Sequence, residues 1–101
     1  MKNLTGIPHL ELKPVIEMDQ NGKITYYNDA AINAMIRYGT RGSLEEFFPE
    51  DLPEILARMG EADTDSIFRN VQMGTATFRL HITLSAQFRI ARLSAVNANE
   101  I

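Results

Sequence analysis

Cysteine is absent from the 101-residue chain, and this absence excludes several kinds of chemistry at once. A chain without thiols forms no disulfide, offers no thiolate to a metal and has no cysteine nucleophile or photochemical thiol. Histidine is scarce as well, with only His9 and His81. Neither has a partner at the short spacing of metal ligands, so we expect both at surface or interface positions.

Long apolar runs are also missing. A membrane-spanning helix needs about 20 consecutive apolar residues, and no segment of this sequence approaches that length. The N-terminal stretch lacks the apolar run of a signal peptide. With 45% apolar residues the chain is long enough for one core and too short for two. We therefore expect one domain, no membrane contact within this segment, and a cytoplasmic location.

Positive charge is in the minority, with 10 Lys and Arg against 13 Asp and Glu and a formal net charge of -3. This balance gives no reason to expect direct nucleic-acid binding, which needs a basic surface. The signs are unevenly placed, because residues 66–99 contain no acidic residue. If the acidic and basic parts fold into opposite layers, the basic layer suits an anionic ligand or acidic partner. Alternatively, these arginines only keep strand faces soluble.

The first half of the sequence predicts a hairpin followed by helices. Two apolar-rich stretches flank Gln20-Asn21-Gly22, and Asn-Gly favours a primed hairpin turn in which both residues take positive φ. Asn28 then has the chemistry of an N-cap, and apolar residues at helical spacing follow it. Ser43 and Glu46 have the spacing of a capping box. Pro49 is expected to begin the clearest helix, which Gly60 ends.

The second half predicts strands, because the apolar period changes to two from Ser66 onward. One strand is expected before Gly74 and a second over residues 78–84. A last strand, Phe88 to Val96, is apolar on much of both faces, as a central strand would be. The predicted fold class is α+β with the order ββααα-βββ.

The sequence from Pro14 to Ala31, PVIEMDQNGKITYYNDAA, resembles the opening hairpin and helix of the PAS domain family. Residues 44–52 resemble the middle helices of that family and residues 66–96 its last three strands. The resemblance covers about residues 12–97. It leaves residues 1–11 as an N-terminal linker or cap and residues 98–101 as a C-terminal linker.

The resemblance implies a five-stranded antiparallel sheet with short helices on one face and a ligand cavity between them. It also implies dimerisation through the outer face or a flanking helix. Such domains act as input modules of sensor histidine kinases in two-component systems and of transcription regulators. We therefore expect a noncatalytic sensory domain that forms a homodimer, binds a small ligand or relays a state, and acts on a downstream effector domain.

The resemblance also bears on cofactors. Haem-binding members use a histidine on the long helix, but residues 50–59 contain none. Flavin photosensors of the family need a reactive cysteine, which this chain lacks. Neither histidine-ligated haem nor cysteinyl flavin is expected, and the identity of any other ligand is left open.

Two sets of residues are candidates for binding. The first consists of apolar side chains that line a ligand pocket or simply form packed core: Met35, Phe47, Leu56, Met59, Phe78 and Leu80. The second would hold an anionic partner, or the substrate of a small α+β enzyme or carrier: Arg79, His81 and Arg89.

A third interpretation is a purely structural dimerisation module. It would expose apolar side chains on the outer face of the sheet, and the candidates for these positions are Ile67, Val71, Ala91 and Leu93. No residue is predicted to be catalytic. The carboxylates that might suggest acid/base pairs are Glu17 and Asp19 in the hairpin and Asp63 and Asp65 in a polar loop, which are ordinary solvated positions.

Overall fold

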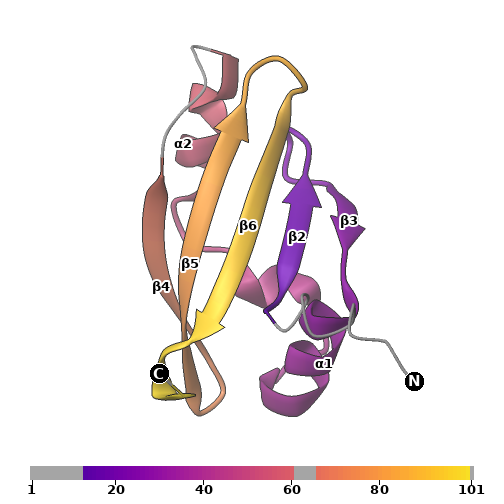
Figure 1. Ribbon diagram of the computed structural model, residues 1–101, viewed down its shortest axis with the longest axis vertical. Coiled ribbons are helices and arrows are strands. Elements are labelled where there is room, and N and C mark those ends of the chain that lie inside the picture. Colours follow the sequence, from indigo (N-terminus) through magenta and orange to yellow (C-terminus); the bar gives the residue numbers. More distant parts are fainter. Residues whose placement is uncertain (1–12, 61–65, 101) are drawn as a thin grey trace, which may run out of the picture.

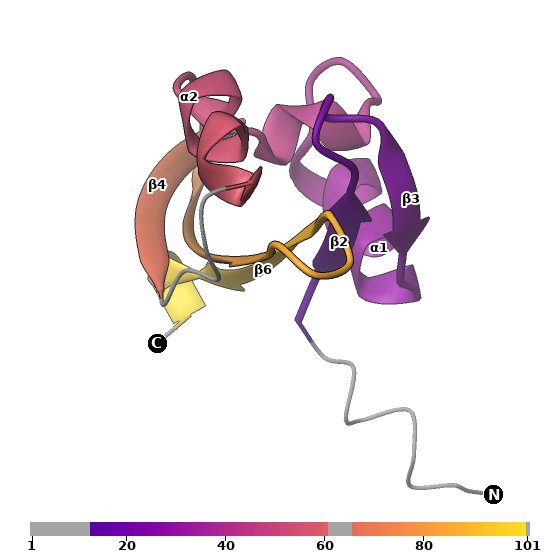
Figure 2. The ribbon, with the colours of Figure 1, turned by 90° about the horizontal axis from the view of Figure 1, so that it is seen from above.

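The computed structural model describes residues 13–60 and 66–100. It confirms an α+β fold with a five-stranded antiparallel sheet, whose strand order is β3-β2-β6-β5-β4. The elements are β2 (Val15–Met18), β3 (Ile24–Tyr27), α1 (Asp29–Tyr38), α2 (Leu52–Ala57), β4 (Ile67–Met73), β5 (Ala76–Ser85) and β6 (Ile90–Asn97), with 3₁₀ turns η2 (Leu44–Phe47), η3 (Arg58–Gly60) and η4 (Ala98–Glu100). Both α-helices lie on the same side of the sheet (Figures 1 and 2).

The sheet joins the two halves of the chain. Strand β2 from the acidic half pairs with β3 on one side and with β6 from the basic half on the other. Strand β6 also pairs along its whole length with β5, so it is the central strand that its composition predicted. Because both halves contribute strands to one sheet, the acidic and basic parts of the chain do not form separate layers.

The core lies between the sheet and the helices. On β5 the side chains of even-numbered residues 76–84 are buried, and the odd-numbered ones point the other way. The alternation comes from the two-residue period of a strand, and β4 and β6 follow it. It assigns Ile67, Ala91 and Leu93 to the buried core, with Val71 packed against them. The expectation that these four side chains face outward is therefore wrong.

Helical structure is shorter than expected. The segment after Ser43 forms the 3₁₀ turn η2, so the described residues contain two α-helices where three were predicted. Helix α2 begins at Leu52 and carries Pro53 in its first turn, so Pro49 does not start it. A proline suits the first helical turn because the amide hydrogen it lacks has no partner there.

The turn between β2 and β3 and the start of β6 both differ from the predictions. Gly22 has φ of 85°, but Asn21 does not take positive φ, so the turn is not the primed type. Instead the Asp19 carboxylate accepts hydrogen bonds from the N–H groups of Asn21 (2.8 Å) and Lys23 (3.0 Å). The last strand starts at Ile90 rather than at Phe88, because the turn from β5 extends through Arg89, which has φ of 55°. His9 and the expected N-terminal linker lie outside the described residues.

Gly74 occupies a close approach between the β4–β5 turn and the end of α1. Its φ is 62°, and a Cβ built there would collide with the backbone oxygen of Tyr38. Gly42 has a similar φ of 69°, but a Cβ there would meet nothing within 4 Å. Substitution of Gly42 therefore tests the cost of the backbone conformation alone, whereas substitution of Gly74 adds the cost of the collision with α1.

We predict that Gly42→Ala lowers the free energy of unfolding by about 1–2 kcal/mol, the usual cost of a left-handed residue with a side chain. Gly74→Ala should cost at least about 1 kcal/mol more, because the turn must also move away from α1. Urea unfolding of both variants measures the difference. Equal losses would show that the turn does not contact the helix end.

Candidate functional site

Asn28 joins the first strand of the sheet to the start of α1. Its Oδ1 accepts hydrogen bonds from the N–H groups of Ala31 (2.9 Å) and Val15 (3.0 Å). Its Nδ2 donates to the backbone oxygen of Lys13 at 3.0 Å. The residue is buried, and it serves as the N-cap of α1. The bonds to Lys13 and Val15 have no signal in the sequence, because they span 15 and 13 residues.

Glu46 is a buried carboxylate enclosed by the loop that follows α1. It accepts hydrogen bonds from the N–H of Thr40 (3.0 and 3.1 Å), the hydroxyl of Thr40 (3.1 Å) and the N–H of Arg41 (2.7 Å). These donors, the Thr40 and Arg41 amides first, lower the pKa of Glu46 from 4.5 to about 2 against the opposing effect of burial. The carboxylate therefore stays ionised and holds the loop in place.

The capping box predicted at this turn forms only in part. The backbone N–H of Ser43 contributes to the lowered pKa of the Glu46 carboxylate. The hydroxyl of Ser43, however, accepts from the N–H of Glu45 at 3.1 Å rather than from that of Glu46. A 3₁₀ turn is tighter than an α-helix, and this shifts the donor that the cap reaches.

Asp51 and Arg69 connect the start of α2 to the edge strand β4. The guanidinium donates Nε–H to Oδ2 at 3.0 Å and Nη2–H to the same oxygen at 2.8 Å, and Nη1–H to the backbone oxygen of Phe68 at 2.8 Å. The hydrogen bond and charge of Arg69 lower the pKa of Asp51, and Asp51 in turn raises the pKa of Arg69. Both groups are thus held in the ionised state by a structural contact.

The candidate pocket residues mostly share one place in the fold. Phe47, Leu56, Met59, Phe78 and Leu80 are all buried in the core cluster. The rings of Phe47 and Phe78 meet edge to face with centroids 5.2 Å apart. Met35 differs, because it is partly exposed on α1. The structure brings five of the six residues together between the helices and the sheet.

The side of the sheet away from the helices is the second candidate site. We define the outer sheet face by six outward side chains of β4, β5 and β6: Phe68, Asn70, Arg79, His81, Arg92 and Val96. The register places Phe68 opposite His81 and Asn70 opposite Arg79. Arg79 lies opposite Val96 on its other side. These residues, far apart in sequence, therefore form one continuous surface.

The structure separates the three residues that were predicted to hold an anionic partner. Arg79 and His81 are both on the outer sheet face, two residues apart on β5. Arg89 lies in the turn before Ile90, whereas Arg79 pairs near the other end of β6. Six strand positions separate these ends, which is about 20 Å. Arg89 instead donates to Oε1 of Gln20 at 3.1 Å, so it does not converge with the other two.

His81 has local partners on this face. Its ring stacks on Phe68 with centroids 4.9 Å apart and an interplanar angle of 12°. Its Nε2 lies 2.7 Å from the hydroxyl of Ser66. The described residues contain no group of three or more His, Asp or Glu side chains arranged to hold a metal ion.

Three exposed residues on or beside the outer face were not among the sequence candidates. Phe68 is 57% exposed, Tyr26 46% and Val96 39%. The signal for Phe68 was present, because the alternation over residues 66–73 separates it from buried Ile67. For Tyr26 and Val96 the pairing of β3 with β2 and of β6 with β5 shows the exposed position.

Comparisons with models of known protein families, with curated proteins and with solved structures found no match to this chain. Separately, neither α-helix of the described ranges has the length and apolar content needed to cross a membrane.

We predict that Asn28→Ala lowers the free energy of unfolding by about 1–3 kcal/mol, because two buried N–H groups lose their acceptor. Asn33 on the same helix is exposed, and Asn33→Ala should change stability by no more than about 0.5 kcal/mol. Urea denaturation of both variants tests this. A loss for Asn28→Ala as small as that of Asn33→Ala would contradict the linking role of Asn28.

Glu46 should make stability depend on acid pH. Its pKa in the folded protein is about 2, below the usual 4.5, so its contribution is complete above about pH 4.5 and disappears as pH falls toward 2. We expect Glu46→Gln to be less stable at neutral pH and to lose stability less steeply over this acid range. The control is Glu45→Gln, at an exposed position of the same turn.

Urea midpoints of the wild type and both variants, measured from pH 7 down to the acid range, give this comparison. Parallel curves for the wild type and Glu46→Gln would show that the loop does not stabilise the ionised carboxylate.

Proposed function

We propose that this chain is a noncatalytic regulatory module of the PAS type. In this proposal it binds a small ligand or self-associates, and it relays that state to an effector domain. The PVIEMDQNGKITYYNDAA sequence and the antiparallel five-stranded sheet with helices on one side support the proposal. Among the described residues, the three groups with shifted pKa values support it too, because each is shifted further into its ionised form and none is tuned toward neutral pH for proton transfer.

The observation that carries the proposal is the position of β6. This strand is central in the sheet and pairs with β2 and β5. Its inward side chains, among them Leu93, form the floor of the core, and its outward side chains include Arg92 and exposed Val96. One strand therefore contacts both the core and the outer sheet face. A shift of β6 caused in the core would move the surface that a partner contacts.

The core contains side chains suited to such a shift. Met18, Met59 and Met73 are all buried there, and methionine adapts its shape because it is unbranched and has three rotatable side-chain bonds. A ligand changes the balance of two conformations only when it binds one of them more tightly. Changes of core shape should therefore alter ligand retention or self-association without unfolding the protein.

We predict that gently purified protein gives, in native mass spectrometry, either a chain with a retained small molecule or a homodimer. Denaturing mass spectrometry of the same sample releases a noncovalent ligand and gives its mass, and an absorbance scan detects a chromophore. A ligand-free monomer would contradict the proposal.

A variant pair locates the effect. Met59→Leu keeps the core volume but changes its shape and flexibility, whereas Ile36→Leu alters a side chain that is 72% exposed on α1. The fraction of chains with ligand, or the dimer fraction, should change for Met59→Leu and stay constant for Ile36→Leu. Equal ligand-bound or dimer fractions for both variants would show that the shape of the core does not control the regulated state.

A further inference from the structure

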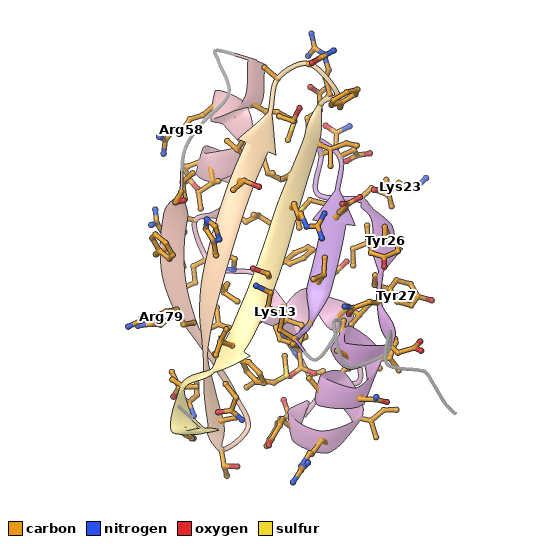
Figure 3. All side chains as sticks on the ribbon, viewed as in Figure 1. Lys13, Lys23, Tyr26, Tyr27, Arg58 and Arg79 are labelled. Carbon is orange, nitrogen blue, oxygen red and sulfur yellow. The ribbon has the colours of Figure 1, made fainter. Side chains whose placement is uncertain are left out.

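The three strands of the outer sheet face, β4, β5 and β6, contribute charge of only one sign. None of the outward side chains of β4, β5 and β6 is a carboxylate, because residues 66–99 contain no acidic residue. Arg92 is partly balanced by Glu17 of β2, at 3.3 Å between Nη1 and Oε2. The side chain of Arg79 is exposed and makes no hydrogen bond or ion pair with any residue in the described ranges. In Figure 3 its side chain reaches past the edge strand β4.

The same face presents large apolar groups beside this charge. Phe68 is 57% exposed and Val96 39%. They flank Arg79 from the two neighbouring strands, since Val96 is directly opposite Arg79 and Phe68 is opposite His81, two residues along β5. Exposed apolar groups that surround an unpaired cation are a common composition of protein interfaces, where the apolar groups supply binding energy and the charge selects the partner.

The charge argues against a second copy of this chain as the partner. A two-fold interface places the same patch on both subunits, so two patches that carry Arg79 and Arg92, with no carboxylate from β4, β5 or β6, would face each other. Like charges at an interface suppress binding. Nucleic acid also fits poorly, because affinity for phosphates needs a larger basic surface than one unpaired arginine in a chain with net charge -3.

We propose that the outer sheet face binds an acidic segment of a partner protein that carries a large apolar side chain. A carboxylate of the segment pairs with Arg79, and its apolar side chain packs against Phe68 and Val96. This inference deepens the proposed function and rests on it, because it names the surface and the chemistry through which a regulatory module acts on its partner.

The test is fluorescence anisotropy of a short fluorescein-labelled peptide of glutamates interrupted by leucines. Saturable binding to the wild-type protein is expected, and it should weaken as salt is added because exposed charges are screened. A peptide with lysine in place of each glutamate should not bind. Arg79→Glu should weaken binding by at least about tenfold, because it replaces attraction by repulsion.

Two matched controls distinguish the outer sheet face from general charge and apolar effects. Arg58→Glu makes the same change of net charge on η3, which lies beside α2 on the helix side of the sheet (Figures 2 and 3), and should leave the affinity within about twofold. Phe68→Ser should weaken binding, whereas Ile36→Ser, which alters an exposed apolar side chain of α1, should not.

Four results would overturn the inference. They are no saturable binding of the acidic peptide, equal losses for Arg79→Glu and Arg58→Glu, binding of a single-stranded oligonucleotide in place of the peptide, and self-association that Phe68→Ser abolishes. Failure of peptide binding in a protein that still retains a ligand or dimerises rejects this inference alone. If the protein is instead a ligand-free monomer and still binds the peptide, the ligand binding and self-association of the proposed function are rejected and this inference is not.

Discussion

The arrangement of this fold depends on the hydrogen bonds of Asn28. One side-chain oxygen accepts both the N–H that begins β2 and an N–H of the first turn of α1. Both donors are backbone groups near the interior, where an unpaired N–H is costly. The position of the helix relative to the sheet is therefore set where the two elements start. At its other end, α1 contacts the β4–β5 turn at Gly74, so the helix is fixed against both halves of the sheet.

Polar contacts hold the loop, η2 and the start of α2 on one side of the sheet, and the described helices therefore leave the opposite side exposed. Glu46 uses the amides of the loop after α1, and Asp51 binds Arg69 of the edge strand. These contacts hold the loop, η2 and the start of α2 on the side where the apolar core is buried. The described helices leave the outer sheet face without cover, and its exposed Phe68 and unpaired Arg79 make it the surface best suited to a partner.

Local patterns predicted much of the fold but little of its long-range chemistry. The Asn28 cap, the alternation of β4 and β5 and the central position of β6 depend on neighbouring residues or on strand composition, and the sequence contains both. The 3₁₀ form of η2 and the start of β6 at Ile90 depend on tertiary contacts instead. The pairing of Arg69 with Asp51 spans 18 residues, and no spacing rule identifies it. The sequence likewise did not reveal that Arg89 lies far from Arg79.

The central claim is that the helices cover one face of the sheet and leave the other free for a partner. Hydroxyl-radical footprinting of the dilute protein, read by mass spectrometry, tests it most directly. The account predicts rapid oxidation of Phe68 and protection of Phe47 and Phe78, which are buried in the core. Protection of Phe68 equal to that of the two core phenylalanines would contradict it, because the outer sheet face would then already be covered.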